Sequence, residues 1–177
     1  MYKLEVQDLH KRYGSHEVLK GVSLAAKCCP FAAEGKRKTL DLHDFLFLDS
    51  QHLVDLCHGL IGGLQPMQQA GFHIHERGDC SAVDASSAGN HFNPGGAAHG
   101  RAGTGKHHLG DMDNLRADAQ GRANVDIHLK GVTLGGGAAT DIAGRALVVH
   151  ANADDYRSQP AGNAGVRIAC GVIRVVR

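Results

Sequence analysis

The chain has 177 residues, a formal net charge of +1 and no tryptophan, and aromatic residues make up 5% of it. This length suffices for one domain with a hydrophobic core, alone or with an appendage. The near-neutral charge and scarce aromatic side chains argue against a nucleic-acid partner and against attraction to an anionic membrane. The five cysteines are an odd number, so complete intrachain pairing is excluded.

The N-terminal residues, MYKLEVQDLHKRY, carry charges throughout and contain no apolar signal-peptide core. The most apolar region, LHDFLFLDSQHLVDLCHGLIGG, is interrupted by Asp44, Asp49 and Asp55, so no membrane-spanning segment is expected. The sequence as written therefore predicts a cytoplasmic protein with no membrane partner.

Residues 1–27 predict two strands, because KLEVQDL alternates apolar and polar side chains and VLKGVSLAA follows the turn RYGSHE. The stretch KLEVQDLHKRYGSHEVLKGVSLAAK also resembles the extreme N-terminus of the ATP-binding subunits of amino-acid ABC transporters. That resemblance ends at residue 27. No GxxxxGK[ST] motif occurs in the chain, so ATP binding is not expected.

Residues 28–69 are unassigned. Their first part, CCPFAAEGKRKT, shows no periodic pattern, and the leucine-rich residues 40–64 fit an amphipathic helix imperfectly, so helix and irregular structure both remain open. Three cysteines match no ligand pattern and are predicted to be free thiols: Cys28, Cys29 and Cys57.

Residues 70–177 form a separate predicted domain that holds eight of the 13 histidines. Short strand patterns stand far apart in it: GFHIHE, NVDIHLKGVTL, RALVVHA and VRIACGVIRVV. Residues 80–112 and 151–166 are predicted loops. Strands joined by long irregular connections indicate an antiparallel β domain, and a long loop in a compact domain is usually functional.

His73 and His75 stand two positions apart. In a strand both side chains would project from the same face, which suits two ligands of one metal ion, or equally a pair exposed to solvent. Further candidate ligands follow: His91, His99, His107, His108, Asp111, His128 and His150. The absence of a CxxC pair and of HExxH removes support for a zinc finger and for a zinc peptidase.

Five motifs go further than spacing: in chain order, GFHIHERGDC, SAGNHFNPGG, HHLGDM, RALVVHANADDY and GNAGVRIACGVI resemble the copper/zinc superoxide dismutase family. The resemblance covers residues 71–173. It implies a mainly β fold, a Greek-key barrel or sandwich. Family members carry three strands before the GFHIHE equivalent, which residues 1–70 do not resemble, so those strands are replaced or missing here. One hypothesis is that the two N-terminal strands substitute for them.

The resemblance also implies two cofactors, a copper ion and a zinc ion. Copper would be held by His73, His75, His91 and His150. Zinc would be held by His91, His99, His108 and Asp111. The bridging His91 and the anion-guiding Arg167 would be the catalytic residues. Asp154 would link His73 to His99, and Cys80 and Cys170 would form a disulfide.

Other interpretations stay open for several of these residues. Arg167 could be a charge at the rim, and Cys80 and Cys170 could remain reduced in a cytosol. His107 and His128 are expected to be solvated side chains.

The implied function is disproportionation of superoxide to oxygen and hydrogen peroxide by a His-bound copper that is alternately reduced and reoxidised. The alternatives are a non-catalytic metal-binding protein and an inactive rearranged fusion product. The resemblance also makes a homodimer a candidate assembly. Bacterial members of the family are usually periplasmic, which contrasts with the absence of an export signal here.

Overall fold

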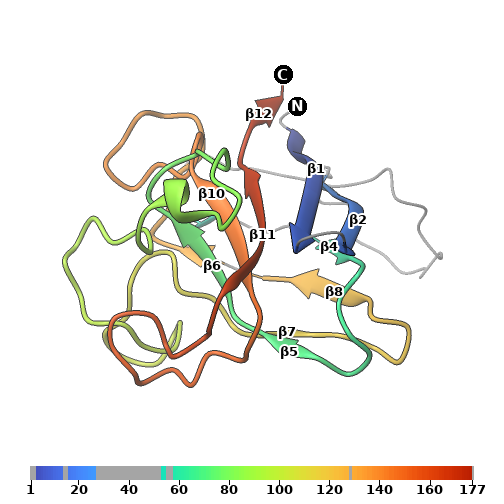
Figure 1. Cartoon of the computed structure of the whole chain (residues 1–177). Helices are drawn as coiled ribbons and strands as arrows, with labels where there is room; N and C mark the ends of the chain where they lie inside the picture. Colours follow the sequence, from blue (N-terminus) through green and yellow to red (C-terminus); the bar gives the residue numbers. More distant parts are fainter. Residues whose placement is uncertain (1–2, 14–15, 27–52, 55–57, 128, 177) are drawn as a thin grey trace, which may run out of the picture.

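The computed structural model describes residues 3–13, 16–26, 53–54, 58–127 and 129–176. Nearly all regular structure in this part of the chain is β, and every strand pair is antiparallel (Figure 1). The described helical structure is one 3-10 turn, η1 (Ser86–Ala88). Across the described residues, no helix has the length and apolar character needed to cross a bilayer. The predicted mainly β, antiparallel fold class is thus confirmed.

The strands follow one another in chain order as β1 (Lys3–Tyr13), β2 (His16–Ala26), β3 (Leu53–Val54), β4 (His58–Ile61), β5 (Gln69–Ala70), β6 (Phe72–His75), β7 (Leu115–Arg116), β8 (Ala123–Asp126), β9 (Leu129–Lys130), β10 (Ala146–His150), β11 (Arg167–Val172) and β12 (Val175–Val176). All six predicted strand patterns, two in residues 1–27 and four in residues 70–177, therefore contain strands. NVDIHLKGVTL holds β8 and β9, and VRIACGVIRVV holds β11 and β12.

The sheet β6-β10-β11 is the framework of the histidine-rich part. β6 and β10 pair so that Ile74 lies opposite Leu147 and His73 lies opposite Val148. Directly opposed residues of an antiparallel pair share a face. Ile74 and Leu147 belong to the main hydrophobic core, and His73 projects from the other face. The alternation of apolar and imidazole side chains in β6 thus places the apolar side chains in the core and the imidazoles on the opposite face of the sheet.

The two predicted N-terminal strands are present as β1 and β2, which pair with each other and with β12 in the order β12-β1-β2. β1 also contacts β11, and β2 contacts β4. Figure 1 shows β1 and β2 beside these strands. The N-terminal strands therefore lie between the C-terminal strands and β4, which agrees with the hypothesis that they fill the place of barrel strands.

The helix considered for residues 40–64 is wrong where the structure describes that region. Leu53–Val54 and His58–Ile61 are strands, which pair with β9 and β8 respectively. Leucine-rich runs suit a helix or a buried strand, and here partners more than 60 residues away in sequence supply the hydrogen bonds. Residues 40–52 and 55–57 lie outside the described residues, as do Cys28, Cys29, Cys57 and His128.

A disulfide joins Cys80 to Cys170, as predicted, with Cα atoms 5.7 Å apart. It connects the segment after β6 to the middle of β11. The loop that follows carries η1 and then His91, whose backbone forms an isolated bridge with His75. Another isolated bridge joins Asp111 to His73. The long segment 80–112 is thus attached to β6 at the two histidine positions.

Candidate metal centre

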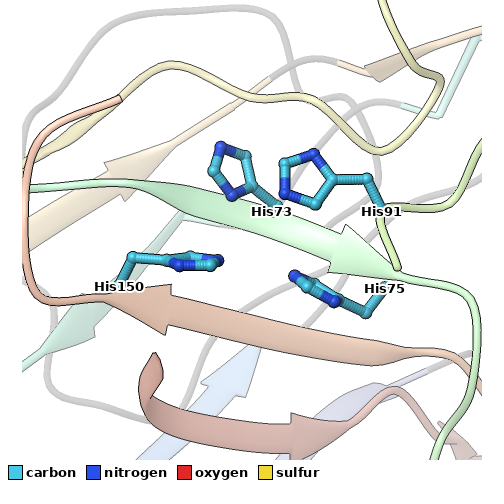
Figure 2. Close-up of side chains that lie close together, drawn as sticks. All are labelled: His73, His75, His91 and His150. Atoms are coloured by element: carbon cyan, nitrogen blue, oxygen red, sulfur yellow. The ribbon is translucent and has the colours of Figure 1, made fainter. Parts of the chain in front are cut away.

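β6 and β10 place three histidines on one face of the sheet. His73 and His75 alternate with core residues, and His150 ends β10 on the same side (Figure 2). The positions opposite His73 and His75 are Val148 and Ala146, whose small side chains leave room for imidazole rings. A fourth ring, His91, comes from the long loop and lies 4.1 Å from the His73 ring, centroid to centroid.

These four residues, His73, His75, His91 and His150, form the first histidine group. Their ligand atoms lie within 4.8 Å of one another, and all four side chains are buried. Among the described residues, one nitrogen of each ring has no hydrogen-bond partner: His73 Nδ1, His75 Nε2, His91 Nε2 and His150 Nε2. A buried polar atom without a partner costs about 1–3 kcal/mol. Four such atoms in one place are what a metal ion would satisfy.

The opposite nitrogen of three of these rings is held by a protein oxygen. The contacts are His73 Nε2 to Asp154 Oδ2 at 2.8 Å, His75 Nδ1 to Gly89 O at 2.9 Å, and His150 Nδ1 to Gly165 O at 3.2 Å. Such contacts fix the ring orientation and the tautomer of metal-binding histidines. Each imidazole therefore aims its unpartnered nitrogen at a common point.

The second histidine group consists of His91, His99, His108 and Asp111, also buried. Asp111 Oδ1 lies 2.8 Å from His91 Nδ1, 3.0 Å from His99 Nδ1 and 3.3 Å from His108 Nδ1. Ligands about 2.0 Å from one ion stand about 3.3 Å apart at tetrahedral corners. Three imidazoles and one carboxylate at these separations fit a tetrahedral metal site.

His91 belongs to both groups through different nitrogens. Its Nδ1 faces Asp111, and its Nε2 is the unpartnered atom that faces the first group. A ring that uses both nitrogens can bridge two ions. The structure thus joins the two groups through one side chain.

Asp154 connects the groups by a second route. Its Oδ2 contacts His73 Nε2 at 2.8 Å, and its Oδ1 contacts His99 Nε2 at 3.0 Å. Burial works to raise the pKa of Asp154, but hydrogen bonds from His73, the Tyr156 amide and His99 outweigh it and lower that pKa. The carboxylate is therefore ionised and accepts a hydrogen bond from one histidine of each group.

The pKa values of the first group are strongly lowered. Burial is the main cause, and it lowers the pKa of His73 to about 4, of His75 to about 2 and of His150 to about 3. The neighbouring positive charge of Arg167 adds to the effect on His75 and His150. These imidazoles are neutral near pH 7, which is the form that binds a metal ion.

Asp111, the carboxylate of the second group, also has a lowered pKa, which for a carboxyl group favours the charged form. Burial acts to raise its pKa, but the His91 ring and the backbone amides of Gly100 and His108 overcome that effect and lower the pKa. The Gly100 and His108 amides lie 3.1 and 2.8 Å from Oδ2, which leaves Oδ1 facing the three histidines. Asp111 thus supplies the second group with its one negative charge.

Arg167 begins β11 and is half-buried beside the first group. Its guanidinium donates to the carbonyl oxygens of Ala85 and Gly89, each at 2.6 Å. Gly89 O also accepts from His75, so one carbonyl links Arg167 to the metal centre. Arg167 thus lies beside the first group, and its guiding role stays a prediction.

One pocket borders the centre on the side of the second group. This pocket of about 500 Å³ is lined by His91 and His108 together with Asn90, Asn93 and Ala161. His107, by contrast, belongs to neither group; its Nδ1 contacts His108 O at 2.7 Å. The structure thus brings all the predicted ligands together and leaves His107 outside, while the ligand assignments themselves stay predictions.

Three supporting residues were missed by sequence reasoning: Asn114, Tyr156 and Gln159. Asn114 exchanges two hydrogen bonds with the Asp154 backbone, at 2.9 and 2.8 Å. The Tyr156 hydroxyl accepts from the Asn114 amide at 2.9 Å. Only the adjacency of Tyr156 to the DD pair of RALVVHANADDY signalled a role, because these contacts join segments about 40 residues apart.

Comparison with known proteins places these features in one family. Residues 49–173 match the copper/zinc superoxide dismutase family, so the match begins 22 residues before the first histidine motif. A superoxide dismutase [Cu-Zn] of Aquifex aeolicus is 48% identical over 115 residues, covering 63% of this chain and 67% of that protein. The copper chaperone for superoxide dismutase of Rattus norvegicus is 38% identical over 179 residues, covering 96% of this chain and 62% of its own length.

Among solved structures, a superoxide-dismutase-like protein from Bacillus subtilis superposes with a TM-score of 0.68 at 31% identity, over 98% of this chain and 99% of that one. The structural match thus extends beyond residues 49–173. The resemblance of residues 1–27 to an ABC transporter subunit is not addressed by these comparisons and stays a prediction. The β fold, the two histidine groups and the match over residues 49–173 show that this chain belongs to the copper/zinc superoxide dismutase family.

Proposed function

We propose that this chain is a copper/zinc superoxide dismutase, which converts two superoxide anions and two protons to oxygen and hydrogen peroxide. The observation that carries the proposal is the set of four buried imidazole nitrogens without a protein partner, joined through His91 to a second group that contains Asp111. A single metal site would need only one of these groups.

The donor sets support one ion of each kind. Four imidazoles suit copper, and three imidazoles with a carboxylate suit zinc. The first group would hold copper and the second zinc. When bound, copper supplies the one-electron chemistry that dismutation needs, and zinc, which does not change oxidation state, fixes the loop.

The chain's own residues supply the remaining functions. Arg167 attracts the anionic substrate and raises its local concentration near His75 and His150. Peroxide formation consumes two protons, and His91 Nε2 is a buried ring nitrogen able to hold one of them whenever it is not coordinated. Asp154 keeps His73 and His99 in fixed orientations through its two carboxylate oxygens.

A second candidate is metal binding or delivery without catalysis. It is favoured by the relative named as a copper chaperone, whose match covers 96% of this chain. The complete first group argues for catalysis instead, because all four imidazoles are present and one nitrogen of each is unpartnered.

The test is metal content together with dismutation activity of the purified chain. We expect one copper and one zinc ion per chain after loading with both metals, and activity that disappears when the chain carries zinc alone. The Val83→Thr variant, at an exposed side chain outside both groups, is the control and should behave like wild type. Full metal loading without dismutation would reject catalysis and support the delivery role, which transfer of copper to an acceptor would then measure.

A further inference from the structure

His99 lies in a segment with no regular structure to fix its backbone. The surrounding residues, GGAAHGRAG, contain neither helix nor strand. His99 is nevertheless buried, 4% exposed, and its ring must meet the second group. A precise position for this ring therefore requires contacts from outside its own segment.

Gln159 supplies those backbone contacts. Its Oε1 accepts a hydrogen bond from the His99 amide at 2.8 Å, and its Nε2 donates to the His99 carbonyl at 2.9 Å. The amide side chain thus satisfies both backbone groups of His99, as a neighbouring strand would. The same Nε2 donates to Arg157 O at 3.2 Å, which orients the Gln159 side chain.

The loop that carries Gln159 also holds the His99 ring. Asp154, five residues earlier, contacts His99 Nε2 at 3.0 Å. Gly162 covers this contact with a backbone φ of +64°, where a methyl group would overlap the Asp154 carboxylate and approach within 2.6 Å of His99 Nε2. Residues 154–162 therefore contact both the backbone and the ring of His99.

We propose that Gln159 is a positioning residue of the second histidine group, which sets the metal affinity of that group by fixing the His99 backbone. Asp154 controls the direction of the ring, but a ring held at one nitrogen can still shift with its backbone. With Gln159 in place, His99 Nδ1 stays 3.0 Å from Asp111 Oδ1. The inference rests on the metal-binding part of the proposed function and not on dismutation.

The experiment measures Co²⁺ affinity of the second group, because Co²⁺ gives a visible spectrum whereas Zn²⁺ is silent. Full-length wild type and Gln159→Met, which keeps the side-chain length but loses both hydrogen bonds, are titrated with Co²⁺ after copper loading. We expect about 10-fold weaker binding for the Met variant, the lower end for outer contacts of metal ligands. Gln159→Glu, which still accepts from the His99 amide but cannot donate, should fall between the two.

Arg157→Ala is the matched control. Arg157 is exposed, lies two residues away in the same loop, and contributes its backbone carbonyl, which the substitution keeps. Melting of the metal-free proteins tests for a merely structural role. Equal Co²⁺ affinity and an unchanged Co²⁺ spectrum in Gln159→Met would overturn the inference, as would a loss matched by Arg157→Ala. A chain that binds Co²⁺ but lacks dismutation would overturn only the proposed function.

Discussion

The two histidine groups share His91 but differ in how the protein satisfies their ligand atoms. In the first group, four buried nitrogens have no partner within the part of the chain that the structure describes. In the second, Asp111 Oδ1 stands within 3.3 Å of all three ring nitrogens. The ring nitrogens of the second group are therefore held by the Asp111 carboxylate. The unpartnered nitrogens of the first group would be satisfied only by a metal ion. The second group can hold its geometry alone, whereas the first is left with four unsatisfied ring nitrogens.

Replacing His91 should have the largest effect, because this side chain belongs to both groups. In His91→Gln we expect dismutation to fall by more than the roughly 100-fold that loss of an outer contact costs. Copper and zinc content should both drop, as measured by metal analysis after dialysis. A variant that kept both metals at full occupancy would show that the two groups are independent sites and not a bridged pair.

Replacing Asp154 should weaken both groups by a smaller factor. Asp154→Leu keeps a similar volume but removes both carboxylate oxygens, to which two histidine N–H groups now donate. We expect affinity losses of about 10- to 100-fold for each metal, measured by competition with a chelator. Asp155→Asn, at the adjacent exposed carboxylate, is the control. A loss confined to one metal would mean that Asp154 serves one group only.

Replacing Arg167 tests the substrate side of the first group alone. Arg167→Met should leave metal content intact and lower the rate of dismutation about 10-fold, since steering by local charge is worth 10-fold or more. The rate of the wild type should fall with added salt, and the rate of the variant should depend on salt less. An equal salt dependence in both proteins would remove Arg167 from the steering role.

How far the sequence predicts this molecule depends on whether the relevant contacts are local. His73 and His75 are neighbours on β6, and His108 and Asp111 lie three residues apart, so short motifs contain their geometry. Leu53 and Leu60 belong to strands whose partners are β9 and β8, and no pattern within residues 40–64 reveals those partners. Gln159 holds His99 across 60 residues of sequence, a contact that only the folded loops create.

The smallest expected effect is a loss of stability of the metal-free chain at acidic pH, which comes from the histidines of the first group. His73, His75 and His150 have folded pKa values of about 4, 2 and 3, below the unfolded value of about 6.5. Above pH 6.5 they are neutral in both states and affect stability little. As the pH falls below 6.5, these histidines become protonated in the unfolded chain but stay neutral in the folded chain. Each of them therefore lowers the free energy of unfolding by about 1.4 kcal/mol per pH unit.

Urea unfolding of the chelator-treated protein between pH 7.5 and 5.5 measures this slope and stays above the range where most carboxylates titrate. His150→Phe removes one titrating group and should reduce the slope by about one proton, with Val83→Thr, at an exposed side chain outside both groups, as the control. Copper loading should raise the free energy of unfolding and keep the slope, because metal-bound histidines still take up no protons in the folded state while the unfolded chain does. A metal-free chain equally stable at pH 7.5 and 5.5 would mean that its first group opens to solvent without metal, and the contrast between the two groups would then lie in their rigidity and not in their charge.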